Sequence, residues 1–286
     1  MLNQSHDTIA MPDGTALVMR TFRITDSPKA AVIIPSAMGV AQQFYTQFAQ
    51  WLARQGYHVT TFDYRGIGLS APPSLRGFPV NIFDWAEDCA VVIDAVKSQL
   101  PEAQLHWIGH SLGGQLLGLI PNRARIDRVV TVATGTGYWL ENTWRTKSVV
   151  WWLWFFVVPI ALRVAGYFPG KRLRKVGNLP RGVMAQWRRW CLSREYVVGA
   201  EGEHVREAYA SVRTPMLSLS FTDDELMSAR GIRSLHGLYT NAPVEYRRIA
   251  PPDVGAQRIG HFGFFRPQFE RTLWPLVPQW LMDQTR

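Results

Sequence analysis

The feature of this chain that most constrains its fold is an alternation of short apolar runs with longer amphipathic stretches. The run at residues 30–36 is apolar almost throughout, as expected for a strand buried on both faces of a sheet. The stretches near residues 44–56 and 84–100 carry apolar residues at helical spacing. This alternation predicts an α/β fold with a mostly parallel sheet and helices on both faces. The runs expected to form strands are residues 30–36, 58–66, 104–109, 128–133, 215–221 and 244–250.

Two more β-rich segments lie near the N-terminus, at residues 7–11 and 15–23, on either side of Pro12-Asp13-Gly14. Because these residue types favour a tight turn, we expect a β-hairpin there. Of the 286 residues, 47% are apolar and 19% are charged. This composition predicts a sizeable core, in one large α/β domain or two small ones, and argues against global disorder.

The alternation stops after Thr134 and resumes with the strand that begins at Pro215. Seven of the 12 tryptophans fall between Trp139 and Trp190. We therefore expect an α/β core formed by residues 1–134 and 205–286, with a helical cap inserted at residues 135–204. A cap over the carboxyl ends of the strands would shape a substrate pocket and exclude water. The candidates for lining an acyl-chain cavity are Trp151, Trp152 and Phe155, with the neighbouring Trp154 and Phe156.

The net charge of +9 is concentrated in the same interval. Nine basic and no acidic residues lie between Arg163 and Arg194, so the rest of the chain sums to zero, which argues against a nucleic-acid-binding protein. A membrane span is not expected, since the apolar run 149–162 has 14 residues and a span needs about 20. Three interpretations remain: a cap helix packed on its own core with a solvated basic face, peripheral contact with an anionic membrane, or binding of an anionic substrate.

Cys89 and Cys191 are the only cysteines, too few for a disulfide framework. The N-terminal residues lack the apolar segment of a secretory signal, so we expect free thiols and a cytoplasmic location, with membrane contact only at the periphery. Neither a His-Glu-x-x-His sequence nor zinc-ligand spacing occurs, so no metal is expected. The G-x-G-x-x-A sequence at 66–71 precedes Pro72-Pro73, which excludes the helix that a dinucleotide cofactor needs.

The sequence IGHSLGG at residues 108–114 places Ser111 between glycines, after a predicted strand and before a predicted helix. A serine that attacks a carbonyl must stand on such a strained, exposed turn, with backbone N–H groups free beside it. We expect the N–H of Leu112 to be one donor of an oxyanion hole. The second donor is expected from the loop after the strand at 30–36, either the N–H of Ala37, which we favour, or that of Met38.

A neutral serine needs a base, and the base needs a carboxylate that orients it. After a serine turn of this kind, the acid and then the histidine follow in the chain. His261, after the last strand, is favoured over His236, which lies in a predicted helix with an expected surface role. Asp224 is favoured over Asp223 as the acid, with the unused carboxylate expected to be a solvated turn residue or a helix N-cap.

His110 precedes the predicted nucleophile, but adjacent side chains on a tight turn diverge. We therefore expect His110 to have a packing role. His204 lies near the end of the insertion, before the strand that should carry the acid, which disfavours it as the base.

These residues together resemble the α/β-hydrolase fold superfamily. The matching pieces are PSAMGV, FDYRGIGLS, IGHSLGG, SFTDDEL and IGHFGFF, in that order. Within it the chain is similar to the bacterial predicted α/β-hydrolase group related to serine aminopeptidase and monoacylglycerol-lipase-like enzymes. The resemblance implies a serine nucleophile, no cofactor and a cap after the sixth strand. It assigns the triad to Ser111, Asp224 and His261, and the oxyanion donors to Leu112 and Ala37.

One departure from the pattern concerns the oxyanion loop, where many relatives carry His-Gly and this chain has Pro35-Ser36. The expected function is a serine hydrolase, carboxylesterase- or lipase-like, that cleaves esters with an apolar acyl group through an acyl-enzyme. An acyltransferase with the same triad is an alternative, and a non-catalytic binding protein on a hydrolase scaffold is another.

Overall fold

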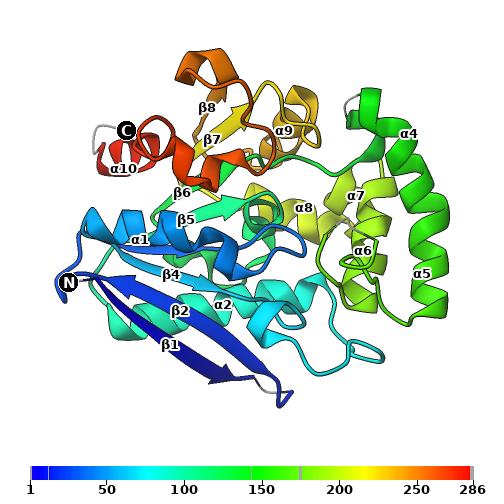
Figure 1. The fold of residues 1–286 in the computed structure, drawn as a ribbon, viewed down its shortest axis with the longest axis horizontal. Coiled ribbons are helices and arrows are strands. Elements are labelled where there is room, and N and C mark those ends of the chain that lie inside the picture. The colour runs from blue at the N-terminus through cyan, green and yellow to red at the C-terminus, as the bar shows by residue number, and fades with distance from the viewer. Residues whose placement is uncertain (1, 12, 143, 174–175, 284–286) are drawn as a thin grey trace.

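Eight strands form one sheet in the order β1-β2-β4-β3-β5-β6-β7-β8 (Figure 1). β2 pairs antiparallel with β1 and with β4, and all other pairs are parallel. The predicted α/β fold is confirmed, as is the N-terminal hairpin, although Pro12 of its turn lies outside the described residues. The strands are β1 (Asn3–Ala10), β2 (Ala16–Arg23), β3 (Ala31–Ile34), β4 (His58–Phe62), β5 (Leu105–His110), β6 (Arg128–Val132), β7 (Met216–Phe221) and β8 (Val244–Ile249).

The computed structural model describes residues 2–11, 13–142, 144–173 and 176–283. Helices cover both faces of the sheet. Successive residues of its inner strands point to opposite sides, so each of these strands contributes side chains to two buried clusters. In β3, Ala31 and Ile33 belong to one buried cluster, whereas Val32 and Ile34 belong to the other. The first cluster includes α2 (Ile82–Gln99), α8 (Glu203–Ala210) and α9 (Ala229–His236), and the second includes α1 (Thr46–Arg54) and α10 (Leu276–Met282).

Between β6 and β7 the chain leaves the sheet and forms helices that lie together beside it (Figure 1). α4 (Trp144–Trp152) continues through a π-helical turn (Leu153–Val157) into α5 (Val158–Val164). α6 (Arg181–Leu192) contacts α5 and α2, α7 (Tyr196–Glu201) contacts α6 and α8, and α8 leads back to the sheet. The N–H of Gly177 donates to the carbonyl of Gly39 (3.0 Å), which joins this helical insertion to the loop after β3.

The stretch Thr146–Val164 is unusually apolar for an exposed helix. It has 19 residues and a mean hydropathy of 1.5, so by length and composition alone it would be long enough to cross a bilayer. Only 17% of it is buried, and its buried residues Trp154, Val158 and Leu162 recur every four positions. One narrow face therefore packs on the protein, and most of the remaining apolar surface faces outward.

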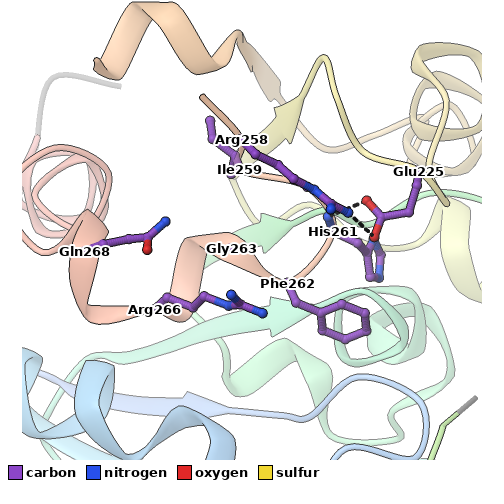
Figure 2. Close-up of a pocket in the computed structure, with 9 residues that line it drawn as sticks. Glu225, Arg258, Ile259, His261, Phe262, Gly263, Arg266 and Gln268 are labelled. Carbon is purple, nitrogen blue, oxygen red and sulfur yellow. Dashed lines mark hydrogen bonds and ion pairs between the residues drawn. The ribbon is translucent and has the colours of Figure 1, made fainter. Parts of the chain in front are cut away.

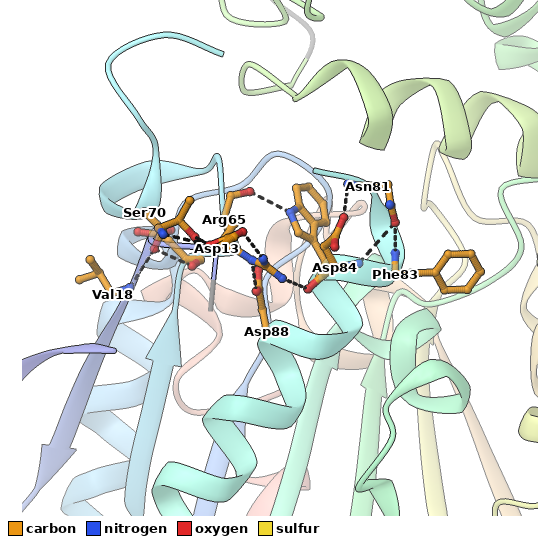
Figure 3. A network of polar contacts seen from close by, with 11 residues as sticks. Asp13, Val18, Arg65, Ser70, Asn81, Phe83, Asp84 and Asp88 are labelled. Atoms are coloured by element: carbon orange, nitrogen blue, oxygen red, sulfur yellow. Dashed lines mark hydrogen bonds and ion pairs between the residues drawn. The ribbon is translucent and has the colours of Figure 1, made fainter. Parts of the chain in front are cut away.

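A buried ion-pair network joins three segments below the insertion (Figure 3). Arg65, from the loop after β4, pairs with Asp88 of α2 and with Asp13 of the hairpin turn. Its side chain is 7% exposed and that of Asp88 is fully buried. The Arg65 guanidinium also donates to the backbone carbonyl of Asp84 (2.8 Å). The backbone carbonyl of Arg65 accepts a hydrogen bond from Trp85 Nε1 (2.9 Å). One cation thus fixes the hairpin, the loop and the start of α2.

Both cysteines, Cys89 and Cys191, are free and buried, which confirms the prediction of thiols. The predicted helix after Ser111 is shorter than expected. α3 (Leu112–Gln115) has only one turn and gives way to a 3-10 segment, Leu116–Leu119.

Candidate active site

Ser111 stands at the turn between β5 and α3, in a backbone conformation that few residues adopt. Its φ is 50° and its ψ is −112°, a strained region for any residue other than glycine. The flanking glycines are required by close packing. A Cβ on Gly109 would lie 2.5 Å from the backbone of Gly114, and one on Gly113 would lie 2.5 Å from the carbonyl oxygen of Pro35. The sequence IGHSLGG therefore forms the tight strand–turn–helix geometry that it predicts.

His261 and Asp224 meet although they are 37 residues apart in the chain. Nδ1 of His261 lies 3.0 Å from one carboxylate oxygen of Asp224 and 3.2 Å from the other, and both side chains are almost fully buried. Asp224 Oδ1 also accepts the N–H groups of Leu226 and Met227, each at 2.8 Å. The pair leaves Nε2 of His261 as the ring nitrogen that can act on another group.

Asp223 and Glu225, on either side of Asp224, accept hydrogen bonds from the backbone of residues 259–261, the histidine loop. Asp223 Oδ2 accepts the N–H groups of Ile259 (2.8 Å) and Gly260 (3.1 Å). Glu225 accepts the N–H of His261 at 3.2 Å and pairs with Arg258 at 3.3 Å (Figure 2). The expectation that Asp223 is a solvated turn residue or helix N-cap is wrong, because its carboxylate is an acceptor for the histidine loop.

The histidine loop reaches the serine turn through His110. Nε2 of His110 lies 3.0 Å from the carbonyl oxygen of His261, and the two rings are 5.2 Å apart. Ser111, the next residue, is 7% exposed, and among the described residues its hydroxyl makes no hydrogen bond. Through the His110–His261 contact, the His261–Asp224 pair is joined to the residue that precedes Ser111.

The loop after β3 differs from the favoured prediction at its oxyanion donor. The N–H of Ala37 donates to Tyr45 Oη at 2.9 Å, so this group already has a partner. In the part of the chain that the structure describes, the N–H groups of Met38 and Leu112 donate to no protein acceptor. Of the two loop residues predicted as donors, Met38 is therefore the one whose N–H has no protein partner, as is the case for Leu112. The hydrogen bond from Ala37 to Tyr45 causes this difference, and the residues of the loop itself do not predict it.

An apolar cavity of about 550 Å³ lies between the α4–α5 stretch and the loops of Asp224 and His261. Of the predicted lining residues, Trp152 borders this cavity. Trp151 and Phe155 do not; they are 38% and 42% exposed and contact each other on the outer side. The cavity is lined by Thr146, Val149, Val150, Trp152, Leu153, Val157, Phe168, Val176, Met184, Trp187, Glu225, Leu226 and Phe262.

The other histidines that follow Ser111 lie away from these groups. His204 is exposed. The expected surface role of His236 is wrong, because its ring is 2% exposed and bonds to Thr131 Oγ1 and to the carbonyl of Ile232, both at 2.8 Å. Within the described ranges, no three His, Cys, Asp or Glu side chains gather as metal ligands would.

Solved structures share this fold across almost the whole chain. A carboxyl esterase from Bacillus coagulans covers 96% of this chain and 98% of its own, with a TM-score of 0.63 and 12% identity. An esterase from Pyrococcus furiosus covers 98% and 91%, with a TM-score of 0.61 and 15% identity. At these identities the likeness concerns the fold alone.

Sequence comparisons identify the family of the chain. Monoglyceride lipase from Rattus norvegicus is 27% identical over 104 residues, and this match spans 36% of the chain and 34% of the lipase. The family model of serine aminopeptidase, S33, matches residues 26–176, which is more than half of the chain and includes the serine turn. The chain belongs to the serine aminopeptidase S33 family and is an α/β hydrolase.

Proposed function

We propose that this hydrolase is a serine esterase that cleaves carboxylic esters with an apolar acyl group. The observation that carries the proposal is the buried His261–Asp224 pair, 3.0 Å apart, beside the strained turn of Ser111. Ser111 Oγ attacks the ester carbonyl while His261 Nε2 takes its proton and then passes it to the leaving alcohol. The Leu112 and Met38 N–H groups stabilise the oxyanion, and water then cleaves the acyl-enzyme.

The apolar acyl group is inferred from the cavity. Its volume of about 550 Å³ is in the range of small-molecule sites, and its walls are almost entirely aliphatic and aromatic. Leu226 and Phe262, which line one side, lie two positions after Asp224 and one position after His261, respectively. An acyl chain in this cavity would therefore have its carbonyl end close to the catalytic loops.

Ser111→Ala tests the proposal. We expect turnover of p-nitrophenyl esters to fall by roughly five orders of magnitude or more, and labelling by a fluorophosphonate probe to disappear. Ser98→Ala, which changes an exposed serine of α2, is the control and should keep both. Unchanged turnover in Ser111→Ala would reject the esterase proposal. Product ratios measured with an added alcohol would separate hydrolysis from acyl transfer, and a wild-type protein that the probe never labels would support a binding role.

A second variant tests where the acyl chain lies. Val157→Trp would fill part of the cavity, so we expect the ratio of kcat/KM for decanoyl over butyryl esters to fall at least about tenfold. Val164→Trp is the matched control, because Val164 is on the same helical stretch but is 72% exposed and lies outside the cavity. Equal ratios in the two variants would show that the chain binds elsewhere.

We further propose that the outer face of the Thr146–Val164 stretch rests on an anionic membrane. Seven of the 14 large apolar side chains that are exposed among the described residues lie on this stretch, and five of them do not line the cavity: Trp151, Phe155, Phe156, Ile160 and Val164. Arg181 and Arg76 donate to the carbonyls of Leu162 and Val164 at its end, and Arg163 is exposed there. Aromatic side chains beside cations suit an anionic lipid interface. Because Trp154, Val158 and Leu162 pack on the protein, a position in the plane of the interface is favoured over a span.

Vesicle sedimentation tests the membrane contact. We expect wild-type protein to sediment with vesicles of phosphatidylglycerol more than with vesicles of phosphatidylcholine, and less as salt rises. Phe156→Glu with Ile160→Glu, 40% and 60% exposed in the wild type, should abolish sedimentation, whereas Ile24→Glu at 42% should not. Binding that survives the double substitution would refute this surface.

A further inference from the structure

One chain of buried hydrogen bonds joins the three segments that build the site. The N–H of Ala37, in the oxyanion loop, donates to Tyr45 Oη at 2.9 Å. Tyr45 Oη lies 2.8 Å from Nδ1 of His110, beside the nucleophile. Nε2 of His110 lies 3.0 Å from the carbonyl oxygen of His261. Three loops that are far apart in the sequence are therefore linked through two side chains, Tyr45 and His110.

The chemistry of the partners assigns the protons along this chain. A carbonyl oxygen only accepts, so Nε2 of His110 must carry a proton. Tyr45 Oη accepts from Ala37 and keeps its own proton for Nδ1 of His110. A neutral imidazole has one donor and one acceptor, which matches both contacts. Burial lowers the pKa of His110 well below its ordinary value, and the nearby His261 adds to that shift, so the neutral form persists.

Packing holds this arrangement in place. Tyr45 and His110 are fully buried. The ring of Phe265 packs against Tyr45 at 4.8 Å and against His110 at 5.0 Å between centroids. A lost hydroxyl would therefore leave a buried donor or acceptor without a partner.

We infer that Tyr45 and His110 are positioning residues that set the oxyanion loop and the catalytic histidine at a fixed spacing around Ser111. The inference rests on the proposed esterase function. With the N–H of Ala37 tied to Tyr45, the next N–H, that of Met38, is the one left for the oxyanion. The backbone of His261 is held on both sides, by Glu225 at its N–H and by His110 at its carbonyl. Neither Tyr45 nor His110 exchanges a proton with substrate.

Tyr45→Phe removes one hydroxyl and keeps the ring. We expect kcat per active site, counted by fluorophosphonate titration, to fall about 10- to 100-fold, because small misplacements of reacting groups are costly. The KM for a decanoyl ester should change less than about twofold, since the acyl cavity is untouched. Tyr57→Phe is the matched control: Tyr57 is also buried, its hydroxyl has no partner among the described residues, and it should keep wild-type kcat.

Two further measurements separate positioning from a general loss of stability. If Tyr45→Phe lowers the Tm but leaves kcat per titrated site within twofold of wild type, the inference is wrong. In a double-mutant cycle with His110→Leu, the double variant should lose no more kcat than the worse single variant, because both break the same bridge. Additive losses would contradict a shared bridge. A wild-type protein without esterase activity would instead refute the proposed function, while the 15N shifts of His110 would still report its Nε2–H tautomer.

Discussion

At the scale of single residues, three consecutive carboxylates at the end of β7 are distinguished by what they accept. Asp224 accepts from the ring of His261, whereas Asp223 accepts only backbone N–H groups of the histidine loop. Glu225 holds the N–H of His261 itself. One short turn therefore both orients the imidazole and fixes the loop that carries it.

This division predicts different outcomes for two similar substitutions. Asp224→Asn replaces the charge that stabilises an imidazolium and the acceptor that selects its tautomer, so kcat should fall about 10⁴-fold. Asp223→Asn keeps an acceptor oxygen for the loop amides and should cost much less. Steady-state kinetics on a p-nitrophenyl ester measures both. Equal losses would mean that Asp223 and Asp224 share the orienting role.

Close packing of the turn after Ser111 against the loop after β3 requires glycine at position 113. Gly113→Ala would place a methyl group 2.5 Å from the carbonyl oxygen of Pro35, a backbone atom that cannot move alone. We expect the free energy of unfolding to fall by about 3 kcal/mol, together with a loss of esterase activity. Urea unfolding followed by fluorescence measures the first effect. An alanine variant with wild-type stability would mean that the β3 loop and α3 separate easily.

The geometry of the candidate site was predictable where a local pattern carries it, namely the strained turn of Ser111 and the contact between His261 and Asp224. Ser111 follows from its glycines, and His261 and Asp224 follow from their places after strands. The hydrogen bond that occupies the N–H of Ala37 was not predictable, because its acceptor is Tyr45, eight residues further along. The burial of His236 was missed for a similar reason, since a helical residue shows its partner, Thr131, only in the folded chain.

At the scale of elements, the Arg65 network ties the hairpin to α2. Arg65 is 52 positions from Asp13 of the hairpin turn and 23 positions from Asp88 of α2. β-rich runs around a turn predict the hairpin and apolar spacing predicts α2, but neither pattern shows which cation joins these two elements. The same limit applies to the insertion. Its aromatic run predicts a cap, whereas the continuous helix through the π-helical turn is set by packing of Trp154 on Trp187 and by the bond from Arg188 to the Trp154 carbonyl (2.5 Å).

Removing Arg65 should therefore cost far more than removing an exposed arginine. Arg65→Met leaves the fully buried Asp88 without its cation, and we expect the free energy of unfolding to fall by about 3–5 kcal/mol. Arg125→Met breaks an ion pair with Asp94 whose side chains are more than half exposed, and should cost less than about 1 kcal/mol. Urea denaturation compares them. Similar losses in the two variants would contradict the structural role of the network.

At the scale of the whole molecule, the two faces of the Thr146–Val164 stretch connect the core to the surroundings. Its inner residues border the cavity, which opens toward the loops of Asp224 and His261. Its outer residues are the largest concentration of exposed apolar side chains in the described ranges. The Gly177–Gly39 bond attaches the same insertion to the oxyanion loop. The same insertion therefore contacts the loop after β3 and borders the loops of Asp224 and His261.

The stability of the whole molecule should depend on its buried histidines. Burial lowers the pKa of His236 to about 4, and burial also lowers the pKa of His106 to about 4. An unfolded chain binds a proton at each of these rings near pH 6.5, whereas the folded protein does so only near pH 4. Stability from this source is therefore complete above pH 6.5 and is lost as the pH falls toward 4. For His236 alone the loss amounts to about 3 kcal/mol.

Urea unfolding between pH 7 and pH 4.5 measures this dependence. Near pH 5, His236→Gln should reduce the slope of unfolding free energy against pH by about 1 kcal/mol per pH unit, because the unfolded state no longer gains that proton. His204→Gln changes an exposed ring and should keep the wild-type slope. The slope is measured because it depends on proton binding. Losing the bonds to Thr131 and Ile232 would instead lower the free energy of unfolding by the same amount at every pH. A His236→Gln slope equal to that of wild type would show that the ring is already charged in the folded protein.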